Sequence, residues 1–229
     1  MTKPLKDKIA IITGGGRGLG KALAVGLAKA GASGICITGS SSVDQLKQVE
    51  REIRSLGTRT KVLPVVADVT SPDACLKAVN QACRALGPVD ILINNAGKGQ
   101  NFVADDHVPF WQAKLSGWKE IIETNVNGPF FMTRAVVKLM ITAGWGRIIN
   151  ISKSRDSMHR PKNSPYGASK AALEAMTLTW AQDLSGTGVT VNTLAPGGSV
   201  DTGFVLPAVR EKIKKKEVTK KFFDPEVIV

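Results

Sequence analysis

Six short apolar runs, separated by amphipathic stretches of helix length, constrain the fold of this 229-residue chain more than any other feature. Most runs are rich in valine and isoleucine and are apolar at successive positions, which is typical of strands in a parallel sheet covered on both faces. The runs are Lys8–Thr13, Gly34–Thr38, Lys61–Val66, Asp90–Asn94, Arg147–Ile151 and Thr190–Leu194. The stretches between them predict helices over Leu19–Ala30, Asp44–Leu56, Pro72–Leu86, Trp111–Arg134 (with a candidate break at Gly128-Pro129) and Tyr166–Asp183.

This alternation predicts an α/β protein with a three-layer, doubly wound parallel sheet of about six strands, that is, a Rossmann fold. Right-handed crossovers bring the carboxyl ends of all strands to one edge of the sheet, and ligands bind along that edge. The length is that of one domain, and no repeat or linker divides residues 1–229.

Composition argues against several classes of protein. No apolar run approaches the roughly 20 residues of a membrane-spanning helix, and the N-terminus lacks the pattern of a signal peptide. The cysteines, Cys36, Cys75 and Cys83, have no CxxC spacing and no nearby histidine, so we expect no metal site but free thiols in a reducing, cytoplasmic compartment.

The net charge of +12 raises the question of a nucleic-acid partner. Much of this charge lies in 210–221, REKIKKKEVTKK, and a run of this kind is usually a solvated helix face. Aromatic residues make up only 5% of the chain, too few for the stacking platform of a single-strand binder. We therefore expect no nucleic-acid partner.

A glycine-rich turn joins the first strand to the first helix. The stretch Thr13 to Gly20, TGGGRGLG, has glycines that let the chain turn tightly and bring backbone N–H groups close to a pyrophosphate at the helix N-terminus. The spacing Gly14-x-x-x-Gly18-x-Gly20 is not the GxGxxG fingerprint. Ala22 stands where a phosphate-loop NTPase needs Ser or Thr to hold magnesium. The turn therefore favours a dinucleotide over a nucleoside triphosphate.

Further motifs follow the later strands, and with them the chain resembles the short-chain dehydrogenases/reductases. These are nicotinamide-dependent oxidoreductases on a single Rossmann domain. The matching motifs run in the family's order from residue 9 to about residue 202: Thr13-Gly14-x-x-x-Gly18-x-Gly20, Asp68-Val69, Asn94-Asn95-Ala96-Gly97, Asn125-Val126, Tyr166-x-x-x-Lys170 and Pro196-Gly197. The resemblance implies a small-molecule substrate and an oligomer, a dimer or a tetramer. It also implies nucleotide contacts from Gly14, Arg17, Gly18, Leu19, Gly20, Asp68, Val69, Asn95, Ala96, Gly97, Tyr166, Lys170, Pro196 and Gly197.

The end of the second strand bears on the choice between NAD and NADP. An acid at this position binds the ribose 2′-OH of NAD and repels the 2′-phosphate of NADP. Here Gly39 is followed by Ser40, Ser41 and Ser42. These hydroxyls can hydrogen-bond a phosphate, and Arg17 can supply charge; in the family, a basic residue just before the middle glycine is associated with NADP. We expect NADP contacts from Ser40 and Ser41, although NAD and a plain polar turn remain alternatives.

Tyr166 and Lys170 lie four residues apart on a predicted helix, so they share one of its faces. A free tyrosine has a pKa of roughly 10, and a neighbouring ammonium stabilises the phenolate and lowers this pKa. The resemblance implies that Tyr166 gives a proton to a carbonyl oxygen while hydride reaches the carbon. It also implies that Lys170 binds the nicotinamide ribose and that Asn125 holds a water in a proton relay.

In the family, a serine thirteen residues before the tyrosine binds the substrate carbonyl. Here that position is Lys153, flanked by Ser152 and Ser154, and neighbouring residues at a strand end point in opposite directions. Three outcomes are open: Ser154 takes the role, which we favour; Lys153 itself polarises the carbonyl; or the site is impaired. The polar loop that follows contains cations that would suit an acidic or phosphorylated substrate, but a solvated loop is the simpler interpretation.

We therefore expect an NADP-dependent enzyme that interconverts a carbonyl and an alcohol. Within this class, a 3-oxoacyl-[carrier-protein] reductase is a subclass that we do not favour, because the turn Ser185-Gly186-Thr187 has no cations for an acidic carrier. The alternative is a weak or inactive dinucleotide-binding homologue that acts as a sensor or a subunit. Lys153 and the short C-terminus support that alternative.

The C-terminus also departs from the family's pattern. The resemblance implies a further edge strand and a covering helix, and FFDPEVIV at 222–229 looks like the start of that helix. Without these elements a sheet edge would be exposed. We expect either a fragment or a partner that covers this edge.

Overall fold

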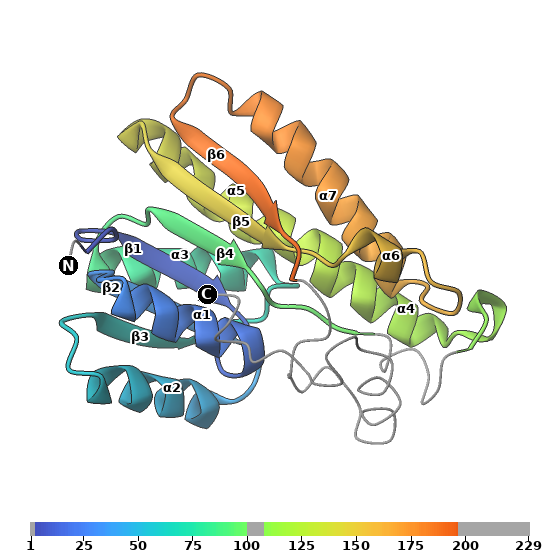
Figure 1. The fold of residues 1–229 in the computed structure, drawn as a ribbon, viewed down its shortest axis with the longest axis horizontal. Helices are drawn as coiled ribbons and strands as arrows, with labels where there is room; N and C mark the ends of the chain where they lie inside the picture. Colours follow the sequence, from blue (N-terminus) through green and yellow to red (C-terminus); the bar gives the residue numbers. More distant parts are fainter. Residues whose placement is uncertain (1–2, 100–107, 197–229) are drawn as a thin grey trace.

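A six-stranded sheet forms the centre of the protein, with its strands in the order β3-β2-β1-β4-β5-β6. The computed structural model describes residues 3–99 and 108–196 (Figure 1). All neighbouring strands are parallel, and the chain order reverses between β1 and β4, which makes this the switch point where such sheets bind ligands. The strands are β1 (Ile9–Thr13), β2 (Gly34–Gly39), β3 (Lys61–Val66), β4 (Ile91–Asn94), β5 (Gly146–Ile151) and β6 (Val189–Leu194).

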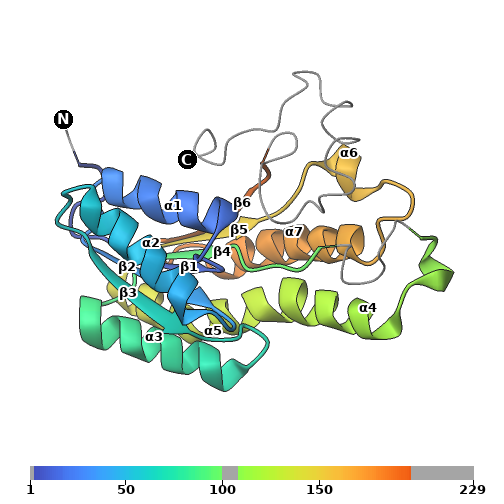
Figure 2. The ribbon, with the colours of Figure 1, turned by 90° about the horizontal axis from the view of Figure 1, so that it is seen from below.

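Helices cover both faces of this sheet, so the predicted three-layer fold class is confirmed (Figure 2). On one face, α1 (Gly18–Lys29) and α2 (Val43–Ser55) pack through an apolar cluster that includes Leu23 and Ile53. On the other, α3 (Pro72–Leu86) and α5 (Gly128–Ala143) share a cluster with the end of α7 (Tyr166–Asp183). The six strands and these helices, α5 apart, begin and end within one residue of their predicted bounds, since alternating periodicity and glycine turns mark them clearly.

The region predicted as one helix over Trp111–Arg134 is different. A short 3-10 helix, η2 (Phe110–Gln112), precedes α4 (Leu115–Ile122), and a π-helical turn, η3 (Glu123–Asn127), joins α4 to α5. Gly128-Pro129 does not break the helix but begins α5, because proline is tolerated in a first turn. The predicted break is therefore wrong by a few residues, and the irregularity is a π turn, which often lies at functional sites.

A second difference concerns the stretch from Ser154 to Pro165, which the sequence predicts to be a loop. It contains one short helix, α6 (Arg155–Met158), which contacts α7.

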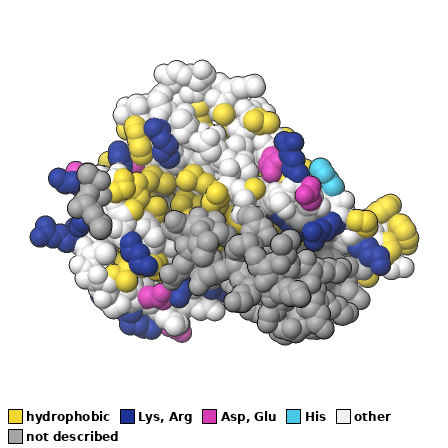
Figure 3. All heavy atoms as spheres, viewed as in Figure 1, with side chains coloured by type: hydrophobic (Ala, Val, Ile, Leu, Met, Phe, Trp, Pro, Cys, Tyr) yellow, Lys and Arg dark blue, Asp and Glu magenta, His cyan; other side chains and the backbone are white. Residues whose placement is uncertain are grey.

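Hydrophobic side chains lie on the surface near the amino end of α4 (Figure 3). Phe110 and Trp111 in η2 and Leu115, the first residue of α4, are exposed.

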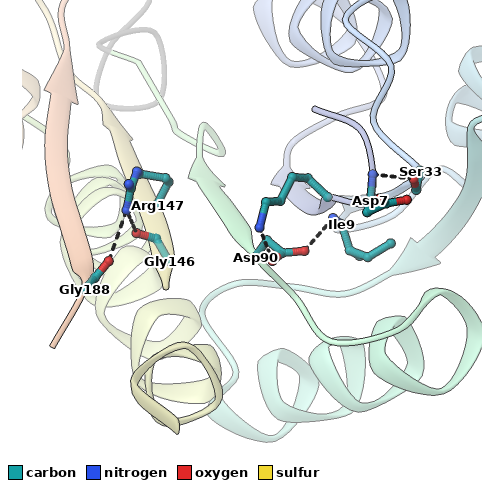
Figure 4. A network of polar contacts seen from close by, with 8 residues as sticks. Asp7, Ile9, Ser33, Asp90, Gly146, Arg147 and Gly188 are labelled. Atoms are coloured by element: carbon teal, nitrogen blue, oxygen red, sulfur yellow. Dashed lines mark hydrogen bonds and ion pairs between the residues drawn. The ribbon is translucent and has the colours of Figure 1, made fainter. Parts of the chain in front are cut away.

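Polar contacts fasten the amino ends of the strands, at the edge opposite the switch point. Lys8 Nζ donates to Asp90 Oδ1 at 3.2 Å, and Arg147 Nη1 donates to the Gly188 carbonyl at 3.1 Å (Figure 4). Lys8 Nζ also lies 3.7 Å from the ring centroid of Trp145, a cation–π contact. These bonds link neighbouring strands and leave the carboxyl edge to the candidate site.

Several expectations concern residues that the structure does not describe, namely the Gly197 contact, the basic run 210–221 and the C-terminal stretch 222–229.

The cysteines match the prediction of free thiols, with Cys36 and Cys75 buried and Cys83 half-buried. Within the described part of the chain, no helix is both long enough and apolar enough to cross a bilayer.

Candidate active site

Thr13 and Asn95 join the carboxyl ends of β1 and β4. The backbone N–H groups of Asn95 and Ala96 donate to Thr13 Oγ1 at 3.0 and 2.9 Å. In return, Asn95 Nδ2 donates to the carbonyls of Thr13 and Gly14 at 2.9 and 3.1 Å. The predicted Asn-Asn-Ala-Gly motif therefore lies directly against the glycine turn, at the switch point.

The backbone conformation and the close packing of this turn require glycine at several positions. Gly14 and Gly18 have φ values of +65° and +53°, in the left-handed region that favours glycine. A Cβ on Gly20 would collide with the carbonyl oxygen of Gly14 and would lie 2.5 Å from Asn95 Nδ2. The first turn of α1 can therefore approach β4 this closely only with glycine at position 20.

The N-terminus of α1 differs from those of α2 and α3. Ser42 caps α2 by accepting from Gln45 N, Ser71 caps α3 in the same way, and each of these helices has an aspartate in its first turn. In α1, whose residues are all described, the N-cap Arg17 forms no side-chain cap and the first turn has no acid. Its N–H groups and the positive end of its dipole thus face outward without a capping side chain, which suits an anion such as a pyrophosphate.

The residues expected to distinguish NADP from NAD lie beside this turn. Ser40 and Ser41 are exposed directly after β2, whereas Ser42 is used as the cap of α2. A Cβ on Gly16 would lie 3.4 Å from Gln45 Cβ, so the glycine turn runs next to the first turn of α2. The next residue is Arg17, which is exposed.

The other predicted nucleotide residues are placed in different ways. Asp68 is exposed after β3, and its Oδ1 accepts from the N–H and the hydroxyl of Thr70, both at 2.9 Å. Leu19 and Val69 are buried. Gly97 is half-buried after β4, and Pro196 is half-buried after β6.

Tyr166 and Lys170 lie together at the start of α7, as predicted. Lys170 is 5% exposed, and its Nζ donates to the Ile151 carbonyl, at the end of β5, at 2.8 Å. This Nζ lies 5.9 Å from the ring centroid of Tyr166. The end of β5 therefore fixes the ammonium beside the phenol ring.

The ionisation of the pair differs from the sequence-based expectation. Burial raises the pKa of Tyr166 to about 12. Burial, and then the charge of Lys153, lower the pKa of Lys170 to about 8. The expected lowering of the tyrosine pKa is thus wrong for this structure, because desolvation of the phenolate outweighs the attraction of the ammonium.

Asn125 lies in the π turn and is fully buried. Its Oδ1 accepts from Lys98 N at 2.8 Å, and its Nδ2 donates to the Lys98 carbonyl at 2.9 Å and to Ser169 Oγ at 3.0 Å. Ser169 Oγ in turn donates to the Tyr166 carbonyl at 2.7 Å. The side chain of Asn125 therefore links the segment after β4 to the first turn of α7, and its role in a water relay stays a prediction.

The three candidates for the carbonyl-binding position have different surroundings. Ser152 is buried, and its hydroxyl donates to Glu174 Oε1 at 2.8 Å, so it is directed at α7. Ser154 is the N-cap residue of α6, and its hydroxyl forms no capping bond among the described residues. The half-buried Lys153 has its Nζ 5.0 Å from the ring centroid of Tyr166. The ammonium of Lys153 thus lies close to the ring of the tyrosine.

A buried network that was not predicted from the sequence holds α7 against the sheet. Asn94 Nδ2 donates to Asn150 Oδ1 at 2.8 Å across β4 and β5, and Asn150 Nδ2 donates to Thr177 Oγ1 on α7 at 2.9 Å. The signal was present in the sequence, since Asn150 interrupts the apolar run of β5 and so had to be paired in the core.

The fold, the glycine turn and the uncapped helix end define a protein of the dinucleotide-binding α/β class. The family model for short chain dehydrogenases matches residues 8–212, and the chain belongs to this family of oxidoreductases that act on alcohol and carbonyl groups. A crystal structure from Sinorhizobium meliloti 1021, assigned as a short-chain alcohol dehydrogenase, superposes with a TM-score of 0.86 at 28% identity. The superposition covers 98% of this chain and 87% of the chain in the crystal structure.

Two curated relatives have names that specify a reaction. Gluconate 5-dehydrogenase of Gluconobacter oxydans (strain 621H) is 35% identical over 188 residues, which are 82% of this chain and 70% of the relative. The 3-oxoacyl-[acyl-carrier-protein] reductase FabG of Thermotoga maritima is 33% identical over 212 residues, 93% of this chain and 80% of the relative. This chain is similar to both, and the names differ in substrate.

Proposed function

We propose that this protein is an NADP-dependent oxidoreductase that interconverts a carbonyl and an alcohol in a small molecule, with Tyr166 as the proton donor. The observation that carries the proposal is the position of Tyr166 on α7, with the Lys170 ammonium held beside its ring by the Ile151 carbonyl. We take residues 1–229 to be one dinucleotide-binding and catalytic domain.

The nucleotide would lie along the carboxyl ends of β1 to β4. The uncapped first turn of α1 fits the pyrophosphate, and the exposed Asp68 with the backbones of Val69, Asn95, Ala96 and Gly97 would line the rest of the site. NADP is supported by the lack of an acid at residues 39–42, at and after the end of β2, and by the exposed cation Arg17 in the glycine turn, which runs next to the first turn of α2. When bound, the nicotinamide supplies the hydride that adds to the carbonyl carbon.

Tyr166 would give its hydroxyl proton to the carbonyl oxygen as the alcohol forms. Because burial raises its pKa to about 12, the phenol stays protonated throughout the neutral range, which is the form that can donate a proton. The Lys170 ammonium would stabilise the phenolate that remains, until solvent returns the proton through a relay that includes a water held by Asn125. We assign the carbonyl hydrogen bond to Ser154, because Ser152 donates to Glu174 instead.

We further propose a small-molecule substrate, a cytoplasmic location and a dimer or tetramer. Exposed apolar side chains on several helices support an oligomer, among them Trp111, Leu115 and Leu178. One observation favours a second candidate, a nucleotide-binding homologue with weak or no turnover. It is Lys153, a cation where the family has a serine. The similarity to a 3-oxoacyl-[acyl-carrier-protein] reductase keeps that subclass as an outcome of a substrate screen.

The test is a titration with NADPH and NADH, followed by a screen of carbonyl compounds for NADPH oxidation. We expect NADPH to bind at least tenfold more tightly than NADH, about 1.4 kcal/mol, and at least one carbonyl compound to be reduced. Tighter binding of NADH would overturn the choice of nucleotide. Binding of NADPH without any turnover would favour the inactive homologue.

A further inference from the structure

Lys153 adds a second cation to the ring of Tyr166. Its Nζ lies 5.0 Å from the ring centroid, and Lys170 Nζ lies 5.9 Å from the same centroid. Lys153 is half-buried and Lys170 is buried, so neither ammonium is fully solvated. Arg160, exposed on the loop between α6 and α7, is close enough to lower the pKa of Lys153 further, after the effect of burial.

These cations lack a counter-charge in the part of the chain that is described. Over residues 3–99 and 108–196, no carboxylate forms an ion pair with Lys153, Lys170 or Arg160. Glu174, the acid closest along α7, accepts instead from Ser152 Oγ at 2.8 Å. Two partly or fully desolvated ammonium groups beside one ring, without an anion, are unfavourable, and an anion that enters the site would offset that cost.

The proposed reaction uses only one of the two lysines. Lys170 is fixed by the Ile151 carbonyl and accounts for stabilisation of the phenolate. Within the described residues, Lys153 has no such backbone partner, and it occupies the place of a neutral hydroxyl in the family. A positive charge at that place changes which substrates can bind, because it attracts anions to the reacting group.

Building on the proposed function, we propose that the substrate carries a carboxylate within a few bonds of its reacting carbon and that Lys153 binds this carboxylate. The short separation follows from the geometry, since Lys153 Nζ lies over the same ring whose hydroxyl would meet the carbonyl oxygen. A carboxylate fits better than a phosphate dianion, which proteins usually hold with several donors or a bidentate arginine. Lys153 is thus assigned as a specificity-determining residue.

The test compares small oxo acids with their methyl esters, which keep the carbonyl and remove the charge. We expect wild type to prefer the acid by at least about thirtyfold in kcat/KM, and Lys153→Gln to lower that preference at least about tenfold through the KM of the acid. Lys153→Arg should retain part of the preference, because it keeps the charge. Arg155→Gln is the matched control, an exposed cation on the neighbouring helix α6, and should leave the preference unchanged.

A binding measurement gives a second readout that does not depend on turnover. Saturated carboxylic acids, which cannot be reduced, are titrated calorimetrically into the protein with NADP⁺. We expect Lys153→Gln to weaken their binding at least about tenfold, with circular dichroism and a melting curve verifying the fold. If no carbonyl compound is turned over at all, this titration still decides the proposal.

The inference is overturned if wild type shows no preference for the acid, or if the preference or the carboxylate binding survives in Lys153→Gln. It is also overturned if the Lys153-dependent preference is for phosphorylated ketones. Reduction of esters without a preference for acids would leave the proposed function intact. Failure of the proposed function looks different: neither nucleotide binds, or no carbonyl compound, charged or neutral, is reduced.

Discussion

The nucleotide half and the substrate half of the candidate site are built from different interactions. In the first half, Thr13, Asn95 and the backbone of the glycine turn are joined by hydrogen bonds of 2.9 to 3.1 Å that involve no charged group. The second half contains Tyr166, Lys170 and Lys153. Burial raises the pKa of the tyrosine and lowers the pKa of both lysines, so it disfavours the charged form of all three side chains. The hydrogen bonds of the first half therefore form on folding alone, whereas the second half holds unfavourable charge that a bound ligand can offset.

The largest difference between the two halves is expected when the proton donor is replaced, because turnover should be lost while nucleotide binding is kept. In Tyr166→Phe, we expect kcat to fall about 10³-fold, about 4 kcal/mol in activation free energy, because the proton donor is lost. NADPH affinity should change less than about threefold, since the contacts that the glycine turn and the Asn95 motif offer to the nucleotide are unchanged. Stopped-flow kinetics and a fluorescence titration measure both. A loss smaller than tenfold would count against Tyr166 as the donor.

The nucleotide half should be broken by a single methyl group. Gly20→Ala places a Cβ against the Gly14 carbonyl and 2.5 Å from Asn95 Nδ2. We expect a loss of about 2–3 kcal/mol in the free energy of unfolding, typical of overpacking. Urea denaturation measures it. Gly16→Ala is the control in the same turn, because its Cβ would be 3.4 Å from the nearest atoms. Equal losses in the two variants would contradict the close approach at Gly20.

Arg17 tests the selectivity of the nucleotide half. In Arg17→Ser, we expect the Kd for NADPH to rise about tenfold and the Kd for NADH to stay unchanged, because only NADPH has the 2′-phosphate. Lys21→Ser is the control, since Lys21 lies in the same helix but pairs with Glu52 at 2.9 Å. An equal rise in the Kd for both nucleotides in Arg17→Ser would show that Arg17 does not bind the 2′-phosphate.

The smallest expected effect is a shift in a pH profile. The Lys170 ammonium is lost as the pH rises through its pKa of about 8, so reduction should decline above that pH. Because the charge of Lys153 lowers this pKa, Lys153→Ser should raise it and carry the alkaline limb of kcat/KM to higher pH. The comparison uses a neutral ketone, with Arg155→Ser as the control. A limb that stays in place or moves to lower pH would exclude the coupling.

The two halves also differ in how far the sequence predicts them. Strand runs, glycines and the Asn95 motif predict the fold and the nucleotide half, because turns and close approaches of the backbone require specific residue types. The sequence did not predict the π turn before Gly128, the direction of Ser152 towards Glu174, or the position of Lys153 over Tyr166. These depend on side-chain packing, as does the rise in the pKa of Tyr166, which comes from burial.

The most direct test of the central claim follows a deuterium label from NADPH that carries deuterium at both C4 positions of the nicotinamide into the product of a carbonyl substrate found in the screen. We expect one deuterium on the former carbonyl carbon with wild type, and a rate of label transfer about 10³-fold lower with Tyr166→Phe. Alcohol formed without the label, or label transferred equally fast by Tyr166→Phe, would contradict a hydride-transfer enzyme with Tyr166 as its acid.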